Sequence, residues 1–123
     1  MNQNNKFSWK KRIDSFKYAF KGINKLFKYE HNARIHLVVA FLVIIAAFIF
    51  KISVNEWIAV VFCIASVFAS EAFNSAIEAL ADKISPQRDP WIEKAKDLSA
   101  AAVLFFAIAS VIIGLTIFIP YIL

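Results

Sequence analysis

Three carboxylates, an amide and a hydroxyl stand in an otherwise apolar part of this chain: Glu71, Asn74, Ser75, Glu78 and Asp82, directly after the uncharged run 57–70. On a helix turning about 100° per residue, these side chains form one stripe, within about 60° on one side of Glu71 and about 40° on the other. Because an ionisable group inside a membrane helix is costly, the stripe must face protein or water, and it predicts a functional site.

The residue types in the stripe favour magnesium over other metals. Mg²⁺ usually takes one or two protein carboxylates and completes its shell with water and phosphate oxygens. The chain has two histidines, His31 and His36, and one cysteine, Cys63. We interpret the histidines as interfacial polar residues and the cysteine as a lipid-facing or packing residue, and not as the ligands of a zinc site. Two glycines in the whole chain exclude a glycine-rich phosphate loop. No serine has a histidine and an acid at spacings that suggest a hydrolase triad.

The elements that must position the stripe are membrane helices. The chain has 123 residues and is 60% hydrophobic, which is too apolar for a small soluble domain. Three windows, about 35–54, 57–81 and 98–122, are long enough to cross about 30 Å of hydrocarbon. We therefore predict an all-α membrane protein, a single domain over 1–123, with a tight turn around Asn55 and Glu56 between the first two spans.

The basic residues are sorted along the chain in a way that predicts topology. Nine lysines and arginines precede the first span, one lies at its end, and four lie between the second and third spans. By the positive-inside rule the N-terminus and the 82–97 loop are cytoplasmic, and the 51–56 turn and the C-terminus lie outside. This sorting accounts for the net charge of +5, so we expect no nucleic-acid partner.

The segment before the first span has the pattern of an amphipathic helix over about 8–28. Apolar residues recur at alternating steps of four and three, and lysines occupy the other faces. We expect this helix to lie in the cytoplasmic interface with its basic face toward anionic head groups. The apolar positions are Trp9, Ile13, Phe16, Phe20, Ile23 and Phe27.

Further polar residues should meet the stripe at the same membrane face. Glu30 precedes the first span, and Lys96 and Asp97 precede the third. Acidic groups and a lysine around a pocket that excludes water suit phosphoryl transfer, in which catalysis is mainly positioning and charge neutralisation. An alcohol could reach such a site laterally from the bilayer.

The same residues carry a family resemblance. The chain resembles the small membrane-integral diacylglycerol kinases of bacteria, which include undecaprenol kinases, from about the surface helix to the last span. The matching stretches, in order and in register, are Phe20-Lys21-Gly22, Glu30-x-Asn32-x-Arg34-Ile35-His36, Glu71-x-x-Asn74-Ser75-Ala76-Ile77-Glu78-x-x-x-Asp82 and Ala95-Lys96-Asp97-x-x-Ala100-Ala101-Ala102-Val103.

The resemblance implies a homotrimer in the bacterial cytoplasmic membrane that uses ATP and Mg²⁺, with sites shared between subunits. It implies that Glu71 is the general base for the lipid hydroxyl and that Glu30 and Glu78 bind metal and nucleotide. It also implies nucleotide contacts from Asn74, Lys96 and Asp97, with further contacts from Lys11 and Tyr18. Lipid contacts are expected from Arg34, Glu71 and Ala100.

The sequence departs from its relatives in one loop. Many of them carry a Tyr-His pair there, whereas this chain has Ser85-Pro86-Gln87-Arg88-Asp89-Pro90-Trp91. Nucleotide contacts from that loop are therefore not transferred, although Arg88 could supply a charge to phosphate.

Several functions fit the sequence pattern. The motif from Glu30 to His36 and the turn at 55–57 resemble the undecaprenol branch more than the diacylglycerol branch, so undecaprenol is the favoured substrate and diacylglycerol the alternative. Outside lipid kinases, the stripe could line an oligomeric ion or proton conduit, or serve only to hold a helix bundle together.

Overall fold

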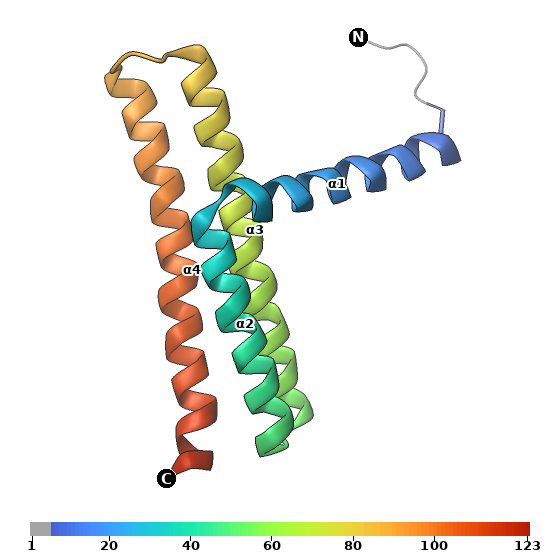
Figure 1. Ribbon diagram of the computed structural model, residues 1–123, viewed down its shortest axis with the longest axis vertical. Coiled ribbons are helices and arrows are strands. Elements are labelled where there is room, and N and C mark those ends of the chain that lie inside the picture. The colour runs from blue at the N-terminus through green and yellow to red at the C-terminus, as the bar shows by residue number, and fades with distance from the viewer. Residues whose placement is uncertain (1–5) are drawn as a thin grey trace.

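The computed structural model describes residues 6–123, which form four helices and no strand. The helices are α1 (Trp9–Tyr29), α2 (His31–Phe50), α3 (Val54–Ile84) and α4 (Pro90–Ile122). The last three are each long and apolar enough to cross a membrane. They run side by side, while α1 projects sideways (Figure 1). The predicted all-α class with three spans is confirmed for these residues, and residues 1–5, including the N-terminus, lie outside the described part.

A one-residue break at Glu30 separates α1 from α2. Glu30 has an extended backbone (φ −101°, ψ 111°), and its N–H donates to the carbonyl of Leu26. Across the break, the Arg34 guanidinium donates to the carbonyl of Lys28 at 3.1 Å. This bond satisfies one of the free carbonyls at the end of α1. The break therefore fixes Glu30 at the corner between α1 and the bundle.

The turn between α2 and α3 lies earlier than expected. It comprises residues 51–53, whereas Asn55 and Glu56 belong to the first helical turn of α3. Lys51 ends α2 in the left-handed conformation (φ 51°), and Ser53 and Glu56 form a reciprocal capping box. Reading 55–56 as the turn was wrong because these polar residues start a helix rather than interrupt one.

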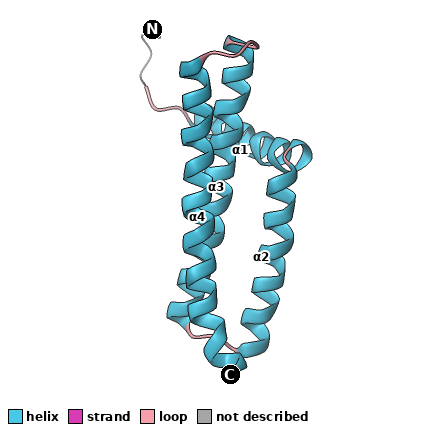
Figure 2. Cartoon of the chain, turned by 90° about the vertical axis from the view of Figure 1, so that its left-hand side faces the viewer, coloured by secondary structure: helices cyan, strands magenta, loops and turns pink. Residues whose placement is uncertain are grey.

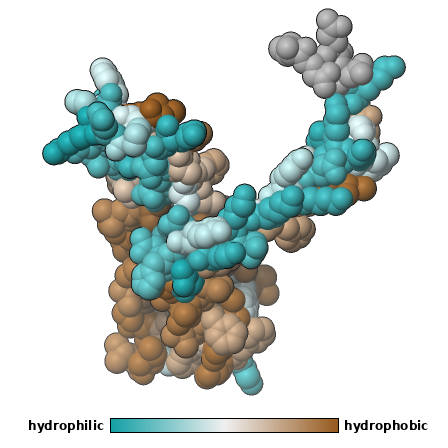
Figure 3. All heavy atoms as spheres, turned by 45° about the horizontal axis from the view of Figure 1, so that its top comes forward, coloured by the Kyte–Doolittle hydropathy of each residue, from teal (hydrophilic) through white to brown (hydrophobic). Residues whose placement is uncertain are grey.

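The ends of α3 and α4 extend beyond a bilayer core. α3 has 31 residues and α4 has 33. At 1.5 Å per residue α3 is about 46 Å long, against roughly 30 Å of hydrocarbon. α4 starts early because Asp89 caps it, accepting from Trp91 N at 2.8 Å. On the face seen in Figure 3, hydrophilic residues predominate on α1 and on the linked ends of α3 and α4, and hydrophobic residues predominate on the spans.

The three spans pack unequally. α3 and α4 make the most extensive contact, and α2 stands apart from α4 (Figure 2). Ala33, Ala40 and Ala47 are the buried residues of α2, and they recur every seven positions. Such small residues let helices approach closely. An apolar cavity of about 100 Å³ lies among the spans, with Cys63 and His36 in its lining.

Candidate active site

The polar stripe of α3 begins deep in the bundle and continues toward the surface. Glu71 is 2% exposed, whereas Asn74 and Glu78 are half-buried. Glu71 lies 17 residues after Val54, the first residue of α3. This spacing is about 26 Å along the axis of α3, so Glu71 lies near the edge of the hydrocarbon core opposite to the start of the helix. One Asn74 N–H donates to Glu78 Oε1 at 3.4 Å. The stripe therefore joins a buried carboxylate to a water-accessible one.

A serine on α4 completes this polar row. The Ser99 hydroxyl lies 2.7 Å from Asn74 Oδ1 and 2.9 Å from the carbonyl of Lys96. Because a hydroxyl donates one proton, these two acceptors share it. No role was predicted for Ser99 from the sequence, so this contact was missed. The available signal was a hydroxyl three residues after Lys96, on the face that meets α3.

Lys96 reaches back across the α3–α4 connection to α3. Its ammonium lies 2.6 Å from Asp82 Oδ1, and both side chains keep contact with water. Asp82, which had no predicted role, is therefore the partner of a predicted nucleotide residue. Arg88 in the connecting loop pairs with Glu93 instead, at 3.2 Å. Asp97 and Ala100 are exposed on α4 beside this region.

Glu71 has a close neighbour from α2. Nε2 of His36 lies 3.2 Å from Glu71 Oε1, within ion-pair distance. The same oxygen makes no hydrogen bond of good geometry to any residue in 6–123, so it keeps an open acceptor position. We had interpreted His36 as an interfacial polar residue. The structure places it against the predicted base.

Glu30 connects this cluster to α1. Glu30 lies at the corner between α1 and α2, and Glu78 lies about two helical turns after Glu71 on α3. A groove of about 530 Å³ separates α1 from α3, lined by Gly22 and Glu30 on one side and by Ser75 among small alanines on the other. The buried hydroxyl of Ser75 has no hydrogen-bond partner among the described residues. An unpaired buried hydroxyl beside a carboxylate leaves capacity to bind a polar ligand.

Of the predicted site residues, Glu30 is the one that lines this groove. Tyr18 is exposed on α1, and the Lys21 ammonium lies 5.7 Å from the centre of its ring. Lys11 is exposed two turns earlier. Arg34 is engaged with the backbone of Lys28 at the helix break. The structure therefore brings Glu30, Glu71, Asn74, Glu78 and Lys96 to one end of the bundle, and leaves Lys11 farther along α1.

The donor set is compatible with Mg²⁺ but does not form a dedicated metal cage. In the described range 6–123, no three side chains of the His, Cys, Asp and Glu types converge on a common point. Magnesium sites commonly use one or two carboxylates, with water and phosphate supplying the other oxygens. Glu30 and Glu78 fit that pattern by chemistry.

Three apolar helices with a carboxylate-rich site at one end define an integral membrane protein with an intramembrane acidic cluster. Residues 17–118 match the sequence model of a family described as prokaryotic diacylglycerol kinase. The chain belongs to this family of membrane lipid kinases.

Individual relatives bear different names. An undecaprenol kinase of Bacillus subtilis is 39% identical over 106 residues, covering 86% of each chain. A diacylglycerol kinase of Synechocystis is 34% identical over 107 residues, which are 86% of this chain and 61% of that protein. A diacylglycerol kinase of Haemophilus influenzae is 32% identical over 103 residues, covering 84% of this chain and 85% of that one.

Proposed function

We propose that this lipid kinase transfers the γ-phosphoryl group of ATP, with Mg²⁺, to the hydroxyl of undecaprenol. One observation carries the proposal: Glu71 is buried with an open acceptor position on Oε1, at the end of the bundle where Glu30 lines a groove between α1 and α3. A nucleotide approaching from water and an alcohol approaching from the bilayer can meet there.

In the proposed reaction, the alcohol oxygen attacks the γ-phosphorus, the bond from that phosphorus to the bridging oxygen of ADP breaks, and the hydroxyl proton passes to the Glu71 carboxylate. Glu30 and Glu78 would hold Mg²⁺, which neutralises phosphate charge. Lys96, which pairs with Asp82, would add a positive charge. Asn74 is held by Ser99 and supports Glu78.

The groove between α1 and α3, which Glu30 lines, is our proposed entry for the nucleotide, whose phosphates would extend beyond the groove to Asn74, Glu78 and Lys96. Its volume of about 530 Å³ is within the usual range for small-molecule pockets, roughly 300–1,000 Å³. Tyr18 and Lys11 would contact the nucleotide beyond its rim, and Asp97 at the α4 side. Arg34, Glu71 and Ala100 would contact the lipid.

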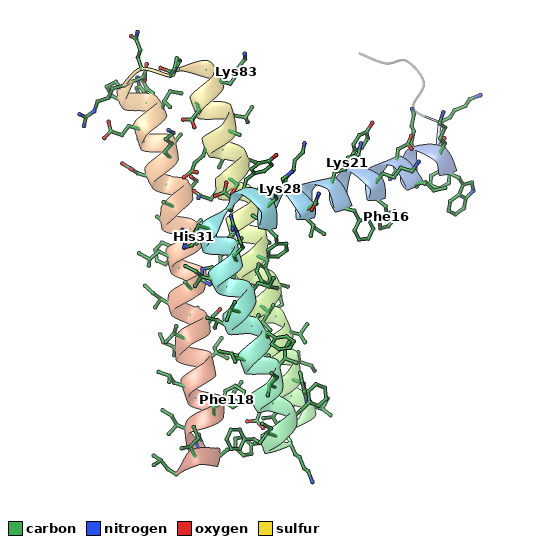
Figure 4. All side chains as sticks on the ribbon, in the orientation of Figure 1. Phe16, Lys21, Lys28, His31, Lys83 and Phe118 are labelled. Carbon is green, nitrogen blue, oxygen red and sulfur yellow. The ribbon has the colours of Figure 1, made fainter. Side chains whose placement is uncertain are left out.

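We propose that α1 lies flat in the cytoplasmic interface. Lys21 and Lys28 point to one side of α1 and Phe16 to the other (Figure 4). We place the lysines toward water and the aromatic side chains toward the bilayer. By the positive-inside rule this water is the cytoplasm, so the N-terminus would be cytoplasmic and the C-terminus external. Three copies would assemble into the homotrimer.

Undecaprenol is favoured because the relative of that name is 39% identical over most of both chains. Diacylglycerol is the alternative, since two other relatives are named for it.

The test is a lipid panel with γ-labelled ATP and purified protein in lipid vesicles. We expect magnesium-dependent labelling of undecaprenol above that of diacylglycerol. We expect Glu71→Gln to lower kcat by about 10²–10⁴-fold, the usual contribution of a general base. Faster labelling of diacylglycerol would assign the other substrate. Absence of labelling on every alcohol would refute kinase activity, and proton or cation flux without ATP would favour a conduit.

A further inference from the structure

We propose that His36 is a positioning residue for Glu71. Its imidazole holds the carboxylate at ion-pair distance, so that the open acceptor position of Oε1 can meet the lipid hydroxyl. The inference rests on the proposed function, because it assigns a task to a neighbour of the proposed base.

The first observation is the isolation of the Glu71 side chain. Glu71 is 2% exposed, and His36 is the only described side chain within ion-pair distance of it. Its neighbours on α3 are occupied elsewhere: the Ser70 hydroxyl donates to the carbonyl of Val67 at 2.8 Å, and Asn74 contacts Ser99 and Glu78. No neighbour on α3 among the described residues holds the carboxylate, so the orienting contact comes from α2.

The second observation is how α2 delivers the imidazole. Ala33 and Ala40 are buried at 0% and 8% exposure, and His36 lies three residues after the first and four before the second. At helical spacing, these three residues share one face. The two alanines allow close approach of the backbones, so the longer side chain between them reaches Glu71. The contact is therefore fixed by packing on both sides of His36.

The third observation is that Oε1 of Glu71 keeps an unused acceptor position. His36 Nε2 lies 3.2 Å from Glu71 Oε1, but the N–H direction does not complete a hydrogen bond, and Oε1 has no other partner in the described residues. A buried carboxylate oxygen with an unused acceptor position is costly unless a ligand fills it. The hydroxyl of the substrate alcohol would supply that missing donor.

The fourth observation concerns access from the bilayer. His36 also lines the apolar cavity of about 100 Å³ among α2, α3 and α4. One imidazole therefore contacts both the carboxylate and an apolar space within the membrane-spanning part. A side chain at this boundary can orient Glu71 without contacting the nucleotide groove, whose lining does not include it.

The kinetic test compares His36→Leu with His36→Gln, because glutamine keeps a polar nitrogen that can lie against the Glu71 carboxylate and leucine does not. We expect His36→Leu to lower kcat roughly 10–100-fold, the effect of a misplaced catalytic group. The KM for ATP should stay unchanged. His36→Gln should recover most of the lost kcat. The matched control is His31→Leu, because His31 is the other histidine of α2 and is exposed at its start.

Three kinetic outcomes would overturn the proposal: wild-type kcat in His36→Leu, equal losses in His36→Leu and His36→Gln, or a loss confined to the KM for ATP. An inactive wild type would instead refute the proposed function, so the two failures are distinguishable.

A stability measurement tests the contact without activity. We expect His36→Leu and Glu71→Leu each to change Tm, and the double variant to change it by an amount different from the sum, since contacting residues are not additive. Additive shifts would remove the contact on which the proposal rests.

Discussion

The hydroxyl of Ser99 on α4 lies 2.7 Å from the amide oxygen of Asn74 on α3. This contact orients the amide so that its nitrogen lies toward Glu78 Oε1, at 3.4 Å. A residue on α4 thereby influences a predicted metal ligand on α3 through one intermediate side chain. The α3–α4 contact, the most extensive in the bundle, is part of the site rather than only its support.

Replacing Ser99 should therefore weaken catalysis without unfolding the protein. We expect Ser99→Ala to lower kcat/KM for Mg-ATP about fivefold, the equivalent of roughly 1 kcal/mol for one hydrogen bond. Steady-state kinetics at fixed lipid measures the change. Ser66→Ala is the matched control, because the Ser66 hydroxyl donates only to the carbonyl of Phe62 in its own helix. Equal values for both variants would show that Asn74 is oriented without Ser99.

Removing the charge of Glu78 should alter the magnesium requirement. We expect Glu78→Gln to raise the Mg²⁺ concentration for half-maximal activity by at least about tenfold. Replacing a residue that only supports a metal ligand already lowers metal affinity by roughly tenfold or more, and replacing the ligand itself should lower it at least as much. A magnesium titration at saturating ATP measures it. Glu93→Gln changes the same residue type in the first turn of α4, where Glu93 pairs with Arg88, and should titrate like the wild type. An unchanged titration in Glu78→Gln would remove this residue from the metal site.

The ion pair between Lys96 and Asp82 predicts that the two residues affect nucleotide binding through one contact, made by Lys96. We expect Lys96→Met to raise the KM for ATP by roughly tenfold, through loss of a charge-assisted contact to phosphate. Asp82→Asn should have a smaller effect in the same direction. Because Asp82 acts through Lys96, the double variant should match Lys96→Met alone.

Lys94→Met serves as the control for that series, since Lys94 is exposed and its ammonium lies 5.6 Å from the ring of Trp91. Effects of Asp82→Asn and Lys96→Met that multiply in the double variant would indicate two independent contacts.

The proposed orientation of the chain can be measured by cysteine accessibility. In a Cys63→Ala background, Val54→Cys should react with an impermeant maleimide on intact cells, because Val54 lies beside the external turn. Gln87→Cys, in the connection between α3 and α4, should react only after the membrane is opened. The reverse pattern would invert the topology, and would place the acidic cluster on the side that lacks ATP.

Periodicity and hydropathy were sufficient to identify the three apolar helices and the stripe from Glu71 to Asp82. A helix turns by a constant angle, so residues of one helix can be assigned to a shared face without knowledge of their neighbours. The long uncharged windows likewise follow from length alone. The turn at 51–53 was missed because polar residues at a helix start and in a turn look alike in sequence.

Contacts between helices were decided only by the tertiary structure. α2 is apolar on nearly every side, so no stripe in its sequence indicates which face meets α3. The packing of Ala33 and Ala40 selects that face and brings His36 to Glu71. In the same way, the register between α3 and α4 brings Ser99 to Asn74 and Lys96 to Asp82. The sequence thus determined which residues lie on the α3 stripe, and the packing of separate helices determined their partners.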